Sequence, residues 1–416
     1  MNKLPLILIF FILLACGDKS KTNNNEDLKK EKDSIIADSL TSEINKLQKE
    51  GHINGFAVAV VNQNGTLYEH GFGYANVKTN ENYTEHTIQN IASISKTFIG
   101  IALLKAQELG KLDLDDPINK HLPFKVINPY YPKEPITIKQ LATHTSTIID
   151  TEYYDTKSYV LKDSLQDSNV EGMVENFNPP QTKIPIQEFL KKILQDKGEL
   201  YKKEGFLKSK PGEKFEYSNI AATLAAVVLE NATGEAFDTF TTKYILEPLN
   251  MSSSGWSFES VDFSKHSKLY SNLQTELPFY SLITYPDGGM LTSAHDLAKY
   301  LTELIKGKSG NGTILNSNSY EEFFSEQLSA EQFTEQNKDN PYNDEYNMGI
   351  FIGHSGNGNI GHTGGDPGVS TLLFFNPKTS IGRLLIINTS LTNQEGVNQF
   401  YGIMDKLGEF EDILNY

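Results

Sequence analysis

The sequence predicts an α+β protein in which both ends of the chain build one antiparallel sheet that is flanked by helices. Short apolar and β-branched runs separated by turn residues occur near both ends, at 56–72 and 370–388. Between them, apolar residues recur at helical spacing in several segments. We therefore expect one domain over 34–416, with a mainly helical region inserted at roughly 97–345.

The first residues have the features of a secretion signal. Residues 4–15 follow a short charged start and are nearly all apolar, yet they are too short for a standard transmembrane helix. They end in Leu-Leu-Ala-Cys at Cys16, which resembles the lipobox of bacterial lipoproteins. That resemblance implies removal of residues 1–15, a lipid on Cys16 and a place at the bacterial cell envelope, on the periplasmic side or the cell surface. An ordinary signal peptide with an incidental cysteine is the alternative.

Composition narrows the possible partners. The 416-residue chain is 38% hydrophobic, which is enough for a large core, and its net charge of −16 argues against nucleic acid. A single cysteine excludes an internal disulfide framework. We expect a small-molecule or peptide substrate, a membrane contact only through the lipid, and neither a metal nor a cofactor. The sequence does not indicate an oligomeric state.

The N-terminal third contains a tether, a helix and a hairpin. Residues 17–33 are almost entirely polar and predict, with the lipidated Cys16, a flexible tether over 16–33. Apolar residues at helical intervals predict a helix over 34–50, ended by Gly51. Strands over 56–61 and 66–72 form a hairpin around the turn at 62–65.

The rest of the chain alternates helices with polar connections. A turn-rich connector covers 110–117, and a polar stretch at 150–183 reads as a loop or insertion. Helices are expected over 186–200, 221–229 and 296–305. A second hairpin (370–375 and 382–388) and a helix over 393–407 close the chain.

A serine and a lysine one helical turn apart are the first candidate for chemistry. Ser93 begins a helical run and Lys96 follows three residues later, so both lie on one helix face. A serine hydroxyl becomes a good nucleophile when a base removes its proton, and lysine can be that base when burial keeps it neutral. On this pair alone, a serine that only caps the helix is the alternative.

Two further segments carry polar groups suited to the same reaction. Tyr217 and Asn219 lie between a Pro-Gly turn and a compact helix, and a tyrosine beside a lysine can exchange protons with it. The same Tyr-x-Asn pattern at Tyr74 and Tyr270 lacks this setting, and we interpret Tyr270 as a surface turn.

The third candidate segment is a glycine-rich run before the second hairpin. It comprises His362, Thr363, Gly364 and Gly365, where the backbone can approach a ligand closely. A glycine-rich turn that simply enters a strand is the alternative.

In this order the three segments resemble the SxxK, YxN and (K/H)TG motifs of the serine penicillin-recognising enzymes. That superfamily contains class C β-lactamases, D,D-peptidases and related esterases, and further similar stretches extend the resemblance over roughly residues 55–388. It implies a β-lactamase/transpeptidase-like fold.

The resemblance also implies a role for each residue. Ser93 is the acylated nucleophile, Lys96 its proton acceptor or electrostatic helper, and Tyr217 a proton shuttle. Asn219 contacts the acyl amide, His362 lines the substrate site, and Thr363 and Gly364 belong to the same substrate-binding segment. The backbone amides of Ser93 and Gly365 form the oxyanion hole.

Two departures from the superfamily pattern bear on the substrate. Thr147 stands where glycine usually follows Thr-His-Thr-Ser, and His362 replaces the lysine of classical β-lactamases. Because histidine titrates near neutrality, we expect ester or amide substrates rather than efficient penicillin hydrolysis. The sequence thus predicts a lipid-anchored serine hydrolase that is a peptidase, an esterase or a weak β-lactamase. A non-catalytic ligand-binding or sensor lipoprotein on the same fold is the alternative.

Overall fold

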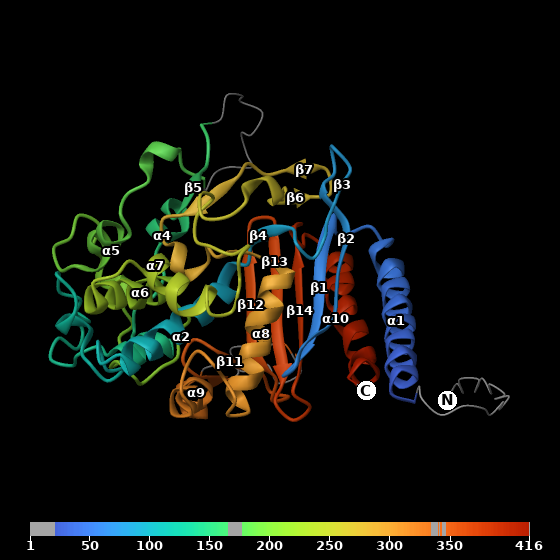
Figure 1. Cartoon of the computed structure of the whole chain (residues 1–416). Coiled ribbons are helices and arrows are strands. Elements are labelled where there is room, and N and C mark those ends of the chain that lie inside the picture. Colours follow the sequence, from blue (N-terminus) through green and yellow to red (C-terminus); the bar gives the residue numbers. More distant parts are fainter. Residues whose placement is uncertain (1–20, 165–176, 334–339, 341, 343–346, 416) are drawn as a thin grey trace, which may run out of the picture.

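The computed structural model describes residues 21–164, 177–333, 340, 342 and 347–415. Its centre is an eight-stranded sheet in the order β10-β11-β12-β13-β14-β1-β2-β3. β1 (Gly55–Asn62) from the N-terminal part pairs antiparallel with β14 (Ile381–Ile387) from the C-terminal part, with Phe56 opposite Ile387. The prediction of one antiparallel sheet built from both ends of the chain is therefore confirmed (Figure 1).

The two predicted hairpins form the middle of this sheet. β2 (Gly65–Asn76) pairs with β1, and β13 (Val369–Asn376) pairs with β14. The remaining strands extend the sheet on both sides: β3 (Glu81–Asn82), β10 (Asn347–Met348), β11 (Gly353–His354) and β12 (Ile360–Asp366).

Helices cover both faces of the sheet. On one face, α1 (Lys21–Gln48) and α10 (Gln394–Leu414) lie side by side and share a core with Val58 and Val60 of β1. On the other face, α8 (Ala294–Lys308) packs against β1 and belongs with Ala57 and Ala59 to the larger core. Because side chains point to alternate faces along a strand, successive residues of the buried strand β1 lie in two separate hydrophobic cores.

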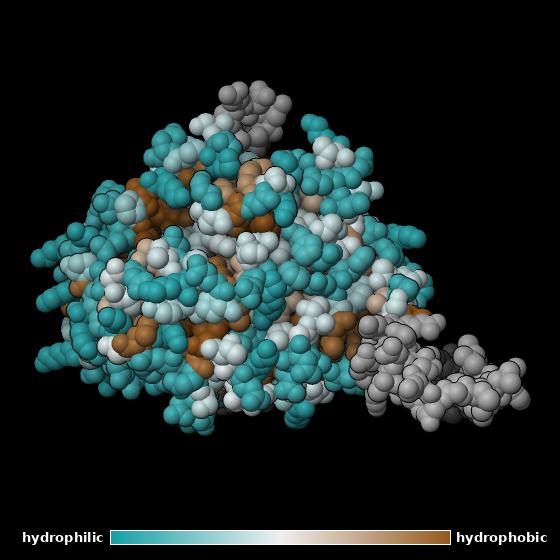
Figure 2. Space-filling model, viewed as in Figure 1, coloured by the Kyte–Doolittle hydropathy of each residue, from teal (hydrophilic) through white to brown (hydrophobic). Residues whose placement is uncertain are grey.

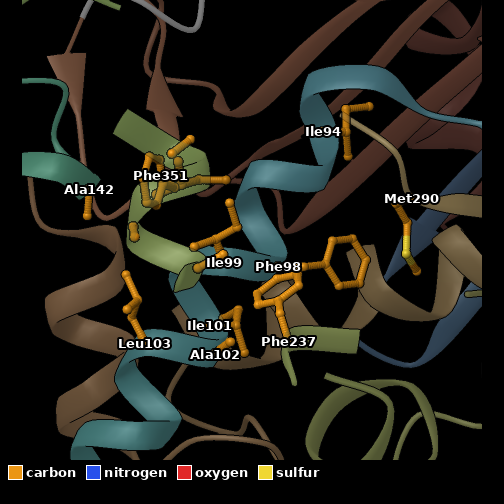
Figure 3. Packing of buried hydrophobic residues seen from close by; sticks show 14 of the residues in the cluster. Ile94, Phe98, Ile99, Ile101, Ala102, Leu103, Ala142, Phe237, Met290 and Phe351 are labelled. Carbon is orange, nitrogen blue, oxygen red and sulfur yellow. The ribbon is translucent and has the colours of Figure 1, made fainter. Parts of the chain in front are cut away.

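A mainly helical region adjoins the sheet, as expected. Its central helix, α2 (Ser95–Glu108), is buried over most of its length, and Phe98 stacks on Tyr300 of α8 with ring centroids 4.0 Å apart. Figure 3 shows Phe98 of α2 and Phe237 among the buried side chains of this core. The other helices of the region are α3 (Ile138–Ala142), α4 (Glu152–Lys157), α5 (Ile186–Leu194), α6 (Asn219–Thr233), α7 (Phe237–Thr241) and α9 (Ser317–Phe324).

Three small two-stranded ladders lie outside the main sheet. They are β4 (Ile88–Asn90) with β9 (Leu291–Ser293), β5 (Tyr159–Leu161) with β8 (Tyr280–Leu282), and β6 (Tyr270–Asn272) with β7 (Thr275–Glu276). Polar residues cover most of the face in Figure 2, with apolar patches between them.

Three local predictions differ from the structure. α1 begins at Lys21, so residues 21–33 of the expected flexible tether are helical; lysine and glutamate are good helix formers even without an apolar face. The stretch 150–183 contains α4 and β5. Tyr270 is buried, and its hydroxyl accepts a hydrogen bond from the Val77 amide, so it is not a surface turn.

The predicted signal peptide (1–15) and Cys16 lie outside the described residues. In the part of the chain that is described, no single helix has the length and apolarity needed to cross a membrane. One pair, Asn219–Thr233 with Phe237–Leu246, passes that test only together and is bent by 81°.

Candidate active site

Ser93 and Lys96 lie at the start of the buried central helix. Ser93 occupies the single 3₁₀ turn η1 (Ala92–Ile94) that leads into α2. Ala92 has a φ of +49°, an uncommon conformation for a residue with a Cβ atom. The Lys96 Nζ atom lies 3.0 Å from the Ser93 Oγ atom and donates a hydrogen bond to it. The lysine amine and the serine hydroxyl are therefore in direct contact.

The Lys96 side chain is fully buried. Its Nζ atom also donates to the main-chain carbonyl of Asp287, over 2.7 Å, and lies 5.1 Å from the centre of the Tyr217 ring. Asp287 ends the short turn η8 (Tyr285–Asp287), 191 residues further along the chain. A buried ammonium group without partners would be very costly, so these contacts explain how the lysine is accommodated.

Tyr217 precedes the N-terminus of α6, as the sequence predicted. Its ring stacks on the ring of His144, with centroids 4.4 Å apart, and the centre of the His362 ring lies 6.3 Å from that of Tyr217. The His144 Nδ1 atom accepts a hydrogen bond from the Ser218 amide. This bond joins the turn after α3 to the start of α6 and fixes the position of the tyrosine ring.

Asn219 is held by a carboxylate that the sequence did not single out. Asp150 accepts hydrogen bonds from the Asn219 side-chain amide (2.8 Å), the Ser218 hydroxyl (3.0 Å) and the backbone amides of Asn219 and Ile220 (3.1 and 2.9 Å). An acidic group at a helix N-terminus satisfies its free N–H groups. The Asn219 amide nitrogen therefore takes part in this cap.

The third predicted segment lies on β12, a strand rather than a turn before a strand. β12 packs against η1, and a Cβ atom on Gly364 would lie 2.4 Å from the Ile91 carbonyl oxygen, so only glycine permits this approach. Gly365 is exposed, and nothing would lie within 4 Å of a Cβ atom there. The His362 side chain is buried, with its Nδ1 atom 2.6 Å from the Thr363 carbonyl oxygen.

Two acidic side chains that sequence reasoning missed lie close to this group. Burial raises the pKa of Asp287 to about 6, and the charge on Lys96 opposes that shift. Burial also raises the pKa of Asp366, at the end of β12, to about 7. Tyr159 and Asn90 donate hydrogen bonds to the Asp366 carboxylate, over 2.5 and 3.3 Å.

The histidine beside Tyr217 is neutral near pH 7. Burial lowers the pKa of His144 well below its usual range, and the positive charges of Lys96 and His362 add to the effect. The Thr-His-Thr-Ser stretch that contains His144 was noticed only as part of the family resemblance, because nothing in its spacing connects it with Tyr217.

The structure thus brings together Ser93, Lys96, Tyr217 and the β12 strand with His362, from three separate parts of the chain. Among the residues that the structure describes, no group of three or more His, Cys, Asp or Glu side chains is arranged to hold a metal ion. The arrangement can transfer protons among a hydroxyl, an amine and a phenol, which is the chemistry that nucleophilic catalysis requires.

The fold and this group of residues define a β-lactamase-like and penicillin-binding-protein-like class of protein. The chain belongs to the Beta-lactamase family, whose family model matches residues 40–407. The sequence-based recognition of this family is confirmed.

Individual relatives agree with this assignment. Protein flp of Staphylococcus aureus (strain MW2) is 30% identical over 261 residues, which cover 61% of this chain and 46% of that protein. This chain therefore spans about half the length of the curated relatives that it matches first.

Solved structures show the same fold. The octameric penicillin-binding protein homologue from Pyrococcus abyssi superposes with a TM-score of 0.69 at 25% identity, covering 89% of this chain and 77% of the other. A β-lactamase/D-alanine carboxypeptidase from Yersinia pestis gives a TM-score of 0.66 at 18% identity, with 92% and 99% coverage.

Proposed function

We propose that this protein is a serine hydrolase that forms an acyl-enzyme on Ser93 and cleaves an amide or ester. The observation that carries the proposal is the 3.0 Å contact between the Lys96 amine and the Ser93 hydroxyl, inside a buried site that Tyr217 completes. Family membership supports hydrolysis as the type of reaction.

The reaction has two halves. The Ser93 Oγ atom attacks the carbonyl carbon of the substrate and forms a C–O bond, while its proton passes to the amine–phenol pair of Lys96 and Tyr217. The C–N or C–O bond to the leaving group then breaks, and the leaving group takes that proton. A water molecule, activated by the same pair, attacks the ester on Ser93 and releases the acid.

Main-chain amides stabilise the negative charge that develops on the carbonyl oxygen. The proposed donors are the N–H groups of Ser93 and Gly365, and the tight contact of Gly364 with Ile91 supports a short separation between the two segments. One such donor contributes about 2.7–4 kcal/mol to transition-state stabilisation.

The charges around the site favour a substrate that does not depend on a carboxylate. Where classical β-lactamases carry a lysine, this chain has the buried His362, and the carboxyl groups of Asp287 and Asp366 lie near Lys96. When ionised, these carboxyl groups disfavour an anionic substrate group. We therefore place ester and amide hydrolysis ahead of efficient β-lactam hydrolysis.

A substrate screen tests the proposal. Purified protein is assayed against p-nitrophenyl esters, D-amino-acid peptides and nitrocefin, with the Ser93→Ala variant as the matched control. The expected result is turnover of at least one ester or amide that disappears in the variant while the circular dichroism spectrum is unchanged. Turnover that persists in Ser93→Ala would contradict the proposed nucleophile.

The alternative is a non-catalytic binding or sensor protein on the same fold. It would be acylated, or would bind its ligand, without releasing product. Single-turnover experiments that follow acylation and release separately distinguish the two, because a hydrolase returns to free enzyme and a sensor remains acylated.

We further propose that the protein is held at the bacterial cell envelope through a lipid on Cys16. The support is the Leu-Leu-Ala-Cys sequence after an apolar stretch. Metabolic labelling with a fatty-acid probe tests this, and the Cys16→Ala variant is expected to lose the label. Equal labelling of the variant would refute lipidation at this residue.

A further inference from the structure

Asp287 contacts the candidate site through both its backbone and its side chain. Its carbonyl oxygen accepts the 2.7 Å hydrogen bond from the Lys96 Nζ atom. Its side chain is 1% exposed, and one carboxylate oxygen, Oδ2, accepts hydrogen bonds from the Tyr154 hydroxyl (3.0 Å) and the Thr223 hydroxyl (2.7 Å). The same residue therefore ties the lysine to α4 and α6.

The hydrogen bond that Asp287 accepts from Lys96 does not require a carboxyl group at this position. A carbonyl oxygen at the end of a short turn is enough to accept the bond from Lys96, and an apolar side chain at 287 would avoid burying a carboxyl group. The chain instead has a carboxyl group there, with two hydroxyl donors aimed at one oxygen. A negative charge beside a buried amine favours the ammonium form of that amine.

We propose that Asp287 is a positioning residue for Lys96: its carbonyl fixes the amine beside Ser93, and its carboxylate favours the ammonium form in the free enzyme. This inference rests on the proposed function, because it assigns the acidic side of the pH–rate profile to the Asp287–Lys96 pair. Lys96 must lose a proton before it accepts one from Ser93, so acylation becomes slower at pH values where the pair remains charged.

Several other titratable groups interact with Asp287 or Lys96. Those that interact with Asp287 besides Lys96 are Tyr154 on α4, Tyr159 on β5, Asp366 on β12 and Asp150. Those that interact with Lys96 besides Asp287 are His144 in the turn after α3, Tyr217 before α6, and Asp366.

The variant Asp287→Asn isolates the charge. Both hydroxyls donate to the same oxygen, so an asparagine whose Oδ1 atom takes that place keeps both hydrogen bonds and the backbone contact. Thr223→Val is a second variant, because loss of one donor makes the charged form of Asp287 less favourable without removing the group. Thr241→Val is the matched control: Thr241 lies on another helix, α7, and its equally buried hydroxyl donates to the Phe237 carbonyl and accepts from the Trp256 indole N–H.

The experiment follows Lys96 directly by NMR of protein with ¹³C-labelled lysine, with Lys96→Arg identifying its resonance. In Asp287→Asn the titration midpoint of Lys96 is expected to fall by about one pH unit or more, the usual effect of a close opposite charge. Thr223→Val moves it in the same direction by less, and Thr241→Val leaves it unchanged. An unchanged midpoint in Asp287→Asn overturns the proposal; if that variant does not fold, an unchanged midpoint in Thr223→Val does so.

Acylation kinetics separate this inference from the proposed function. The acidic limb of the acylation rate is expected to move to lower pH in Asp287→Asn by the same interval as the Lys96 titration. Wild-type protein that reacts with no acyl donor would refute hydrolysis, while the NMR titration would still decide the role of Asp287. A reactive wild type whose acidic limb does not move in Asp287→Asn would refute only this inference.

Discussion

The imidazole ring of His144 stacks on the phenol ring of Tyr217, with centroids 4.4 Å apart and an angle of 28° between the planes. His144 has a φ of +54°, and its Nδ1 atom accepts a hydrogen bond from the Ser218 amide. A strained, buried residue thus holds the start of α6 and the tyrosine in one place. Strain of this kind is found where the surrounding structure enforces a functional geometry.

Replacement of His144 by phenylalanine keeps a ring against Tyr217 but leaves the buried Ser218 N–H without its acceptor. The free energy of unfolding is expected to fall by about 1–3 kcal/mol at pH 7.5, as measured by urea denaturation. His70→Phe, at an exposed histidine on β2, serves as the control and should change stability by less than about 0.5 kcal/mol.

The stabilities of the wild type and the His144→Phe variant are expected to depend differently on pH. Because the pKa of His144 is lowered in the folded state, the unfolded chain binds a proton first as the pH falls below about 6.5. The wild type therefore loses stability through this residue as the pH falls, whereas the His144→Phe variant lacks this histidine and does not. The difference in unfolding free energy between the two proteins is expected to shrink from pH 7.5 to pH 5. A difference that widens at pH 5 would contradict a neutral, buried His144.

Asp366 predicts the opposite pH dependence. Its pKa is raised to about 7 in the folded protein, so the folded state holds its proton more tightly than the unfolded state. The associated stability is present below the unfolded pKa, near 3.9, and is lost as the pH rises through 7. Asp366→Asn should therefore be more stable than wild type by on the order of 2 kcal/mol at pH 8 and similar to it at pH 4. Thermal melts of both proteins at pH 4 and pH 8 test this. An equal difference in melting temperature between Asp366→Asn and wild type at the two pH values would contradict the prediction, because it would mean that Asp366 is ionised throughout.

Tyr217 and Tyr270 have different predicted roles despite their shared Tyr-Ser-Asn sequence. Tyr217→Phe removes the phenol beside Lys96 and should lower kcat by about 10²–10⁴. Tyr270→Phe removes only the acceptor for the Val77 amide; it should cost about 1 kcal/mol of stability and little activity. Steady-state kinetics and urea denaturation of both variants decide the matter, and equal losses of kcat would mean that the proton shuttle lies elsewhere.

Gly364 and Gly365 offer a matched pair on β12. In Gly364→Ala the new methyl group would meet the Ile91 carbonyl and the Thr371 hydroxyl at 2.4 and 2.3 Å, so β12 must move away from η1. We expect a loss of about 1–3 kcal/mol of stability together with most of the activity. Gly365→Ala meets no atom within 4 Å, and its thermal midpoint should equal that of wild type. A normal midpoint for Gly364→Ala would show that the strand does not need this close approach.

Local patterns were enough to predict the architecture. The two hairpins are marked by apolar, β-branched runs around turn residues, and the segments between them have helical periodicity, so the sheet from both ends of the chain and the helical insertion followed from the sequence. The tether was mispredicted because low apolar content was taken to exclude a helix. Tyr270 was mispredicted because its hydroxyl is hydrogen-bonded to the Val77 amide, 193 residues away in the chain, which no local pattern shows.

The candidate site was only partly predictable for the same reason. Ser93 and Lys96 are three residues apart, so helix geometry places them together, and the Tyr217 and His362 segments were recognisable through family resemblance. Asp287 and Asp150 have no such local signal. Asp287 reaches Lys96 through a main-chain carbonyl, which any residue could supply, and Asp150 caps a helix that begins 69 residues later.

The most direct test of the account is the mass of the protein during reaction. Incubation with an activated ester or a β-lactam, followed by intact-protein and peptide mass spectrometry, should show one acyl group, carried on the peptide that contains Ser93. Ser93→Ala should carry none. An acyl group on a different residue, or substrate turnover without any adduct on Ser93 at short reaction times, would contradict the claim that Lys96 and Tyr217 serve this serine.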